Sequence, residues 1–427
     1  MIKSSASLQS ILLLASLSLP HCALAVDAAP EVEHWHLTSF GTLGFAHTAG
    51  DDLHARRDLS RPDTFSNDES WRLDSLIGAQ VSTDLSETLS ATVQGVYRAR
   101  HEQSLERSIE RAFVGWQATP HLNIHGGRLR NDIFMLSDYR DAGFAYPWIR
   151  PPIEFYGQVA VNSFDGLDAV YNIPLDGSML TMRLFSGHTE VDLQESPNSI
   201  TTQKFDDFRG ASVAYESDRW RVKVGGSHFV FGNEAAALQG LQAALKNPVI
   251  QPAWPEAQSY ADLVAMKGKS LAFYSAGVSY ENLWQLSGEV GYTTSDWQAL
   301  PDMIAAYFSI GRHIGQVTPY LLLASIRPLQ DSPTISAPQS TPSAAANAQL
   351  SGLYGGLTLI AGSVPFNQHT VSVGARWDVL SNVALKLQWD HSEVHAGGAG
   401  LWTNETKVAP PSAATVDLVS ASVNWVY

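Results

Sequence analysis

The feature that most constrains the fold is an alternation of apolar and polar residues with a period of two, which continues to the last residue. In the closing segment the apolar positions are Val419, Ala421, Val423, Trp425 and Tyr427. The same alternation recurs in segments 71–82, 89–100, 220–227, 370–379 and 383–390. A period of two is the pattern of β-strands with one apolar and one polar face. The sequence therefore predicts an all-β protein.

The connections between these strands are alternately short and long. Short turns separate many neighbouring patterns, whereas long segments that are polar or rich in Pro and Gly lie near residues 47–69, 101–107, 131–158, 187–206, 231–270, 294–302, 327–366 and 393–413. A soluble β-sandwich, the main alternative, gives no reason for every second connection to be long. Short turns at one rim and long loops at the other are typical of outer-membrane barrels. We therefore expect a transmembrane antiparallel β-barrel of about sixteen strands, with short periplasmic turns and long extracellular loops.

The two ends of the predicted barrel must meet. An open strand edge cannot be left in hydrocarbon, so the last strand is expected to pair with the first, which lies near residues 34–47. The terminal aromatic residue then lies at the membrane interface, where such rings are favoured.

The first 25 residues predict an exported protein. They contain Lys3, an apolar stretch near Ile11 to Leu19, and small residues at Ala23 and Ala25, which is the pattern of a secretory signal peptide. A lipid anchor on Cys22 is disfavoured because the preceding residue is a histidine rather than a small residue. We expect residues 1–25 to be a signal peptide and residues 26–427 to form a single outer-membrane barrel domain without a thiol.

Charge and motifs exclude several functions. The formal net charge is −15, which argues against a nucleic-acid partner. The sequence contains no Gly-rich phosphate loop, nucleophile elbow or zinc motif. The histidines of "HWH" and "DHSEVH" are more simply interpreted as polar groups at a rim than as metal ligands. We expect no enzymatic activity, no cofactor and no metal.

The third long segment, residues 131–158, is too apolar for a solvated loop. Its apolar side chains are Phe134, Met135, Leu136, Phe144, Tyr146, Trp148, Ile149, Phe155 and Tyr156. They are expected to bury against the inner wall, and the prolines 147, 151 and 152 would stiffen the segment. The alternative is an outward loop that packs on a neighbouring subunit.

Charged residues flank this loop. The strand positions predicted to face the lumen include Arg72, Arg98, Arg100, Arg111, Arg128, Arg130 and Arg183. The loop itself supplies Asp132, Asp138, Asp141 and Glu154. We expect the two groups to face each other across a narrow aqueous gap, where low-dielectric walls focus the field.

Three features together resemble the sixteen-stranded general porins of Gram-negative bacteria: the "GGR" that ends strand five, the long third loop and the terminal aromatic residue. This resemblance implies that residues 131–158 form a constriction loop inside the barrel, opposite a basic wall. Arg140 and Arg150 depart from the acidic pattern, so the preference for anions or cations stays open. The resemblance also implies a homotrimer, and a C-terminal signal at Trp425 and Tyr427 that the barrel assembly machinery recognises.

The expected function is a porin in the outer membrane of a Gram-negative bacterium. Such a protein forms a water-filled channel for passive diffusion of small hydrophilic solutes and ions, in contact with the lipid bilayer and lipopolysaccharide. The alternative is a barrel with a closed lumen that acts as an adhesin, receptor or structural protein. A barrel enzyme is a third possibility, but we find no Ser/His or acidic dyad for it.

Two further loops have distinctive compositions. Leu238, Leu241 and Leu245 predict one apolar helix face in the segment 231–270. The stretch 331–349, in the segment 327–366, is of low complexity and predicts a mobile loop.

Overall fold

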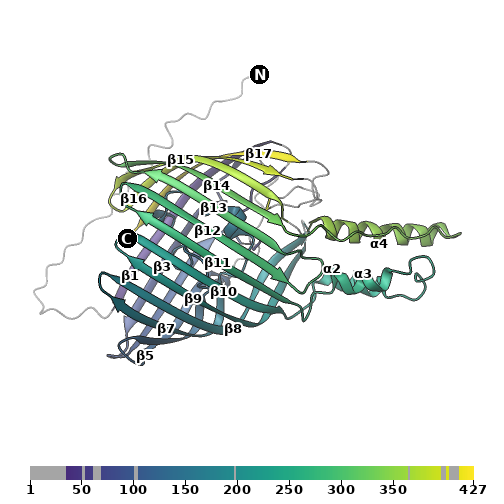
Figure 1. Cartoon of the computed structure of the whole chain (residues 1–427), viewed down its shortest axis with the longest axis horizontal. Helices are drawn as coiled ribbons and strands as arrows, with labels where there is room; N and C mark the ends of the chain where they lie inside the picture. The colour runs from purple at the N-terminus through teal and green to yellow at the C-terminus, as the bar shows by residue number, and fades with distance from the viewer. Residues whose placement is uncertain are drawn as a thin grey trace, which may run out of the picture. The chain divides into compact units, whose positions relative to one another are not determined.

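A computed structural model describes residues 35–50, 53–60, 69–100, 104–196, 199–363, 366–395, 401–402 and 413–427. The predicted signal peptide at residues 1–25 lies outside the described residues and stays a prediction. Residues 35–427 contain one closed antiparallel barrel, made of sixteen long strands and the two-residue strand β2 (Figure 1). The predicted fold class is confirmed.

The first half of the barrel contains β1 (Trp35–Gly50), β2 (Glu69–Ser70), β3 (Leu76–Asp84), β4 (Leu89–Arg98), β5 (Ile109–Gln117), β6 (Leu122–Arg130), β7 (Ser163–Leu175), β8 (Ser178–Ser196) and β9 (Ser199–Ser217). The second half contains β10 (Trp220–Phe231), β11 (Ser270–Glu281), β12 (Trp284–Ser295), β13 (Met303–Arg312), β14 (Val317–Pro328), β15 (Gln368–Leu380), β16 (Val383–Val394) and β17 (Ala414–Val426). The helices are α1 (Leu105–Ser108), α2 (Ala236–Leu245), α3 (Ala257–Val264) and α4 (Ala344–Ser363).

The barrel closes where the last strand meets the first. β17 pairs with β1 in an antiparallel register that runs from Val426 opposite Phe40 to Val416 opposite Gly50. Tyr427 continues the ladder, because its amide donates to the Ser39 carbonyl and its own carbonyl accepts from the Ser39 amide. The predicted pairing of the two end strands is therefore confirmed.

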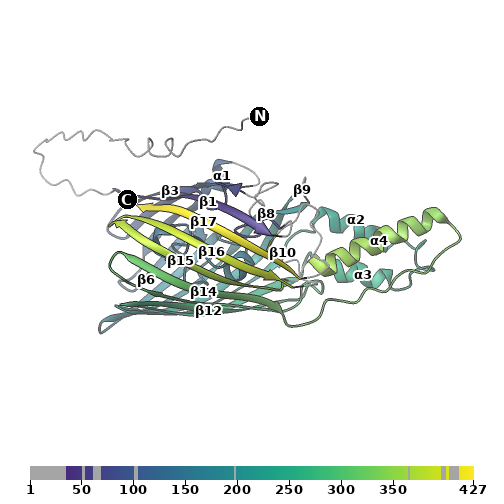
Figure 2. The ribbon, with the colours of Figure 1, turned by 90° about the horizontal axis from the view of Figure 1, so that it is seen from above.

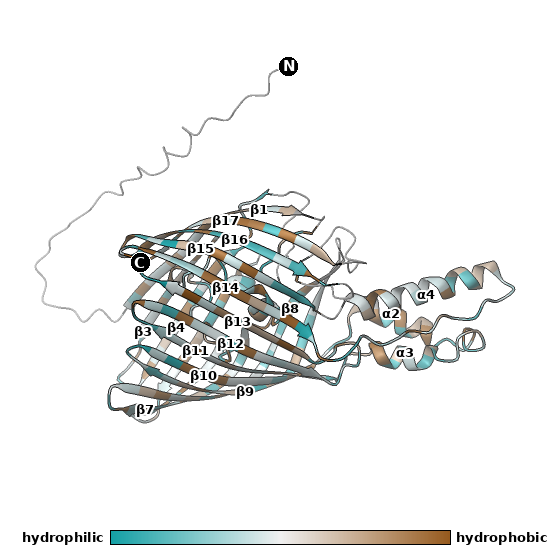
Figure 3. Ribbon diagram, turned by 45° about the horizontal axis from the view of Figure 1, so that its top comes forward, coloured by the Kyte–Doolittle hydropathy of each residue, from teal (hydrophilic) through white to brown (hydrophobic). Residues whose placement is uncertain are grey.

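Alternation places one face of each strand inside and the other outside. On β14, Leu321 and Leu323 are exposed on the outer face, whereas Tyr320, Leu322 and Ile326 are buried on the inner face. Figure 3 shows the resulting bands of apolar and polar residues across the barrel wall. The inner face of β14 is itself apolar, and the loop described below supplies the apolar surface that covers it.

Two expected boundaries are wrong. The segment 187–206 was expected to be a long loop, but β8 and β9 continue through most of it as a paired hairpin. The strand expected from Trp71 begins only at Leu76, because the Ser70 hydroxyl accepts hydrogen bonds from the Arg72 and Leu73 amides and turns the chain.

Three helices form an appendage at the long-loop end of the barrel (Figures 1 and 2). The predicted helix in the segment 231–270 is present as α2, with Leu238 and Leu245 buried. The low-complexity region was expected to be a mobile loop, yet α4 begins within it and packs on α2, and its Tyr354 ring lies 6.2 Å from that of Trp254, between α2 and α3. Among the described residues, no helix combines the length and apolar character required to span a membrane.

Candidate functional site

The loop between β6 and β7 lies inside the barrel. It contains the short helices η3 (Gly143–Ala145) and η4 (Ile153–Gly157), which contact β1, β17 and β12 to β15. Within residues 131–158 only Asp138 and Ala145 are exposed. The predicted insertion of the third loop is confirmed, and the outward-facing alternative is wrong.

The first half of the loop reaches a cluster of arginines and carboxylates that we call the arginine cluster: Arg98, Arg100, Glu110, Arg130 and Asp141. Asp141 accepts from Arg98 and from Arg130, the latter at 2.6 Å. Glu110 on β5 accepts from Arg98 at 2.5 Å and from Arg100 at 2.8 Å. Arg98, Arg130 and Asp141 are buried, so these charge-assisted bonds form in a low-dielectric setting.

A second ionic contact begins at Asp132. This carboxylate pairs with Lys223, with Arg183 at 3.3 Å, and accepts from the Ser212 hydroxyl at 2.9 Å. Arg183 also reaches Asp168 at 2.8 Å. The loop is thereby tied to β8, β9 and β10.

Asp138 is the loop carboxylate with the greatest access to solvent. Its side chain is 55% exposed and pairs with Arg111 at 3.0 Å. Ion pairs of this kind are screened by water and salt.

Four of the predicted arginines therefore meet loop carboxylates: Arg98, Arg111, Arg130 and Arg183. The expected aqueous gap between wall and loop is wrong for these residues, because the opposite charges are in direct contact.

Three of the predicted arginines have other surroundings. Arg100 pairs with Glu110, and Arg128 makes a bidentate pair with Asp165 on β7 at 2.8 and 2.9 Å. Arg72 is exposed in the bend before β3 and forms no ion pair among the described residues. Among the described residues, none of these three arginines forms an ion pair with a carboxylate of the loop.

Glu154 also departs from the prediction. It is 1% exposed and accepts from Gln368 at 2.7 Å and Thr370 at 2.5 Å, both on β15, rather than from an arginine. Burial raises the pKa of the Glu154 carboxyl, although the hydrogen bonds from Thr370 and Gln368 oppose this shift.

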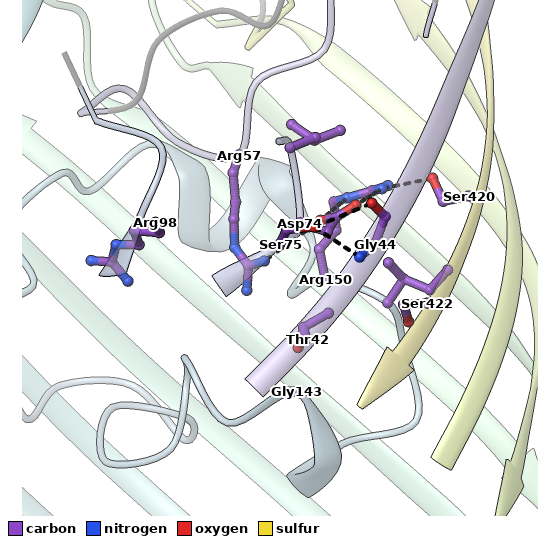
Figure 4. Close-up of polar contacts among 12 residues, drawn as sticks. Thr42, Gly44, Arg57, Asp74, Ser75, Arg98, Gly143, Arg150, Ser420 and Ser422 are labelled. Carbon is purple, nitrogen blue, oxygen red and sulfur yellow. Dashed lines mark hydrogen bonds and ion pairs between the residues drawn. The ribbon is translucent and has the colours of Figure 1, made fainter. Parts of the chain in front are cut away.

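The loop carries a buried cation of its own, Arg150, to the part of the wall where the barrel closes. Arg150 donates to Asp74 at 2.6 and 3.0 Å and to the Ser420 hydroxyl at 2.6 Å (Figure 4). It also donates to Asp390 at 2.9 Å. Arg57 approaches Asp74 at 3.5 Å. The charge arrangement is thus reversed here, with a basic loop residue against an acidic wall.

Lys386 on β16 anchors the loop through its backbone. Its ammonium donates to the carbonyls of Gly143 at 2.5 Å, Tyr146 at 2.6 Å and Trp148 at 2.6 Å. Sequence reasoning missed this residue. Its inward position in the alternating segment 383–390 was visible, but the loop carbonyls that it binds were not.

Aromatic packing fills the space between these anchors. Trp148 is 1% exposed, packs edge-on against Tyr307 with ring centroids 5.5 Å apart, and donates to the Ser309 hydroxyl at 2.8 Å. Glu289 on β12 accepts from Tyr156, from Tyr307 at 2.8 Å and from the Met135 amide at 2.9 Å. The expectation that the apolar loop residues bury against the inner wall is confirmed, with Phe144 half-buried beneath Arg376.

A polar cavity of about 530 Å³ lies beside the arginine cluster. Its charged lining includes Arg98, Arg100, Arg107, Glu110, Arg128, Asp165, Asp192 and Lys204. Both signs of charge line it, so it suits small hydrated solutes better than apolar ones. Within the described residues no group of His, Cys, Asp or Glu is placed to hold a metal ion.

The predicted C-terminal signal residues differ in their surroundings. The ring of Trp425 lies over Gly41 on β1, where a Cβ atom would be 2.1 Å from the ring. Tyr427 is 82% exposed at the end of the barrel. Trp425 therefore packs across the junction between β17 and β1, whereas Tyr427 remains accessible.

No protein-family model matches the sequence, and a comparison with curated proteins finds no match. Solved structures, in contrast, are similar over nearly the whole chain. OmpF of Salmonella typhi, in complex with daunomycin, is 12% identical with a TM-score of 0.51 and covers 92% of this chain and 97% of its own. The anion-selective porin from Comamonas acidovorans is 13% identical with a TM-score of 0.51, and the match covers 92% of this chain and 100% of the porin. The outer-membrane channel DcaP of Acinetobacter baumannii is 8% identical with a TM-score of 0.51, and the match covers 94% of this chain and 100% of DcaP.

These similarities define the class of protein by its fold. The chain has the closed β-barrel fold of these outer-membrane porins and of this outer-membrane channel. The resemblance seen in the sequence is confirmed at this level.

Proposed function

We propose that this barrel is an outer-membrane porin through which small hydrophilic solutes and ions diffuse passively. The observation that carries the proposal is the polar cavity beside the arginine cluster, inside a closed barrel whose third loop is folded inward. Because most of the loop is buried, the path it leaves is narrow and runs along the charged side of the lumen. Because the path is narrow and lined by charges of both signs, it selects solutes more by their size and hydration than by their charge.

Bilayer recording tests this proposal. Purified protein is added to a planar lipid bilayer, and we expect small, ohmic current steps. Protein that inserts without any steps would contradict the porin proposal.

A specific observation favours a second candidate function, a closed barrel that binds a partner at its surface. The helices α2, α3 and α4 extend the apolar core beyond the strands, with Leu238, Val264 and Leu357 buried on the helices and Trp254 buried between α2 and α3. A variant with residues 133–157 replaced by a short Gly-Ser linker distinguishes the two functions. If this variant conducts ions and the wild type shows no current steps, the closed barrel is favoured.

We also propose a trimer in which the early and late strands form the contact. Electrophoresis of unheated and boiled samples tests it, since a trimer migrates as one large species until it is boiled. A single small species in the unheated sample would contradict the proposed trimer.

Assembly is proposed to depend on the exposed Tyr427. Replacement of this residue by aspartate should lower the yield in the outer membrane, and the Ser420→Ala variant serves as a control inside the same strand. Normal yield of the aspartate variant would contradict a role for Tyr427 in assembly.

A further inference from the structure

An apolar groove of about 580 Å³ runs along the outer wall of the barrel, across β10 to β13. Its floor consists of the small residues Ala276, Gly288 and Ala306. Its sides include Trp220 and Phe308. The groove is separate from the cavity in the lumen, because the two share no lining residue and the large side chains Trp220, Val290 and Phe308 are exposed on the outer wall.

The strand register explains why the wall is hollow at this point. Gly288 is paired with Val278 on one side and with Phe308 on the other, so a bare backbone lies between two large outward side chains. In the next outward row, Ala276 and Ala306 flank Val290. Alternation on neighbouring strands thus places three small residues together on a surface that is otherwise covered by large apolar ones.

Aromatic rings line the end of the groove near the short turns, and a cation lies just beyond this end, at the strand position that follows Leu286 toward the turn. The rings of Trp220 and Tyr280 are 4.7 Å apart, and the guanidinium of Arg312 lies 5.3 Å from the ring centroid of Trp284, the residue opposite it. Arg312 is exposed and forms no ion pair with another described residue. Tryptophan and tyrosine are favoured at the level of lipid headgroups, and a basic residue there can meet a phosphate.

The dimensions match one leaflet of a bilayer. From Trp284 to Val290, β12 extends for about 20 Å at ~3.4 Å per residue. With a strand tilt of about 45°, this length covers ~14 Å of depth, close to half of the ~30 Å hydrocarbon core. A cation at one end and a groove of this depth reproduce the layout of a phospholipid, with a charged head and an apolar chain.

We propose that this groove binds one acyl chain of a glycerophospholipid whose phosphate pairs with Arg312. The chain lies over Gly288 between Val278 and Phe308. A second copy of the protein is the rival occupant. It is disfavoured because this face presents a cation without a counter-ion, which a lipid phosphate supplies and an identical face does not.

Native mass spectrometry of the purified barrel tests the proposal, with dioleoyl phosphatidylglycerol as the probe. The double variant Ala276→Leu/Ala306→Leu fills the groove with side chains that point outward. The matched control is Ala169→Leu, at an outward position between Leu167 and Tyr171 on β7. We expect wild type and control to retain one tightly bound lipid per protomer that the filled variant loses.

A second variant separates the headgroup from the chain. Arg312→Gln should weaken retention of the lipid about tenfold, as expected for loss of one charge-assisted contact. Heat-dependent migration on gels confirms that each variant is folded before lipid retention is measured.

Two outcomes would overturn the proposal. One is equal lipid retention by the filled variant and the Ala169→Leu control. The other is a filled variant that keeps its lipid but dissociates into smaller species, which would assign the groove to a neighbouring copy. Trp fluorescence quenching by brominated-chain phosphatidylglycerol gives an independent readout in membranes, and we expect stronger quenching for wild type than for the filled variant.

Discussion

The two halves of the inserted loop are held in different ways. Residues 131–141 carry the ion pairs, from Asp132, Asp138 and Asp141 to basic side chains of the wall, in addition to the packing of Phe134 on Phe273. Residues 143–157 are fixed by aromatic packing, by the three carbonyls bound to Lys386, and by Arg150. The lining of the polar cavity includes Arg98, the partner of Asp141 in the first half, and no ion-pair partner of the second half.

The two halves of the loop therefore have different roles. The aromatic half fills the lumen and sets how much of the cross-section remains. The charged half reaches the polar cavity through Arg98, which pairs with Asp141 and lines the cavity, so the charges of this half influence which ions are favoured there. Changes in the aromatic half should therefore alter conductance, and changes in the charged half should alter selectivity.

The largest effect is expected from Trp148→Ala in the aromatic half. The substitution removes the contact with Tyr307 and the hydrogen bond to Ser309, and truncation of a buried tryptophan costs about 3–5 kcal/mol. The loop should loosen, and single-channel conductance should rise severalfold. Trp377→Ala, on the outer face of β15, is the control and should leave conductance unchanged. Equal conductance in all three proteins would show that this half does not limit the path.

Asp141→Asn should have the next largest effect. Arg98 and Arg130 would lose a buried counter-ion, and removal of one partner from a buried pair costs about 3–5 kcal/mol. We expect a lower unfolding temperature and a reversal potential in a salt gradient that shifts toward anion preference. The comparison between the two halves fails if conductance rises while the reversal potential stays constant.

Asp138→Asn should be milder. The Asp138 side chain is largely exposed, and surface ion pairs contribute about 0–1 kcal/mol. Stability should barely change, whereas the reversal potential should shift in the same direction as for Asp141→Asn, because the carboxylate faces solvent. An unfolding temperature lowered as much as in Asp141→Asn would mean that the two carboxylates are equally important for stability.

The smallest effect is the dependence of loop stability on the protonation of Glu154. Its raised pKa means that the folded protein binds this proton more tightly than the unfolded chain does. The stabilisation is therefore complete below the ordinary glutamate pKa of about 4.3 and is lost as the pH rises through the raised value. Unfolding temperatures measured across this range should decline less for Glu154→Gln than for wild type. The exposed Glu281→Gln is the control, and an unchanged slope for Glu154→Gln would contradict the assignment.

Alternation and loop lengths were sufficient to predict the barrel and its closure, and the apolar composition of residues 131–158 together with the resemblance to porins predicted the inserted loop. They did not predict which arginines meet the loop, because alternation is broken at two points. The register of β5 shifts against β4 between Gln94 and Gly95, which brings Glu110 into the arginine cluster. Gly127 adopts a φ of 134°, and a Cβ there would be 2.3 Å from the Ala112 carbonyl oxygen.

The wall residues that hold the second half of the loop were harder to predict for another reason. Asp74 lies in a bend rather than in a strand, and Lys386 binds backbone carbonyls that have no signature in the sequence. The appendage was also only half predicted. The leucine spacing of α2 was readable, but α4 combines several glycines with small polar residues, and the contact with α2 stabilises it more than its own helix propensity does.

The bond between Arg150 and Ser420 has a consequence for the order of folding. Its partners are separated by 270 positions in the chain, and Ser420 belongs to the last strand to be synthesised. Contacts at such separations form late, because a large loop must close first. The third loop can reach its final position only after β17 has arrived, so its docking marks the completion of the barrel. Until β17 has paired, Arg150 lacks the Ser420 hydroxyl as an acceptor. The loop therefore closes the lumen of an incomplete barrel less tightly than that of a complete one.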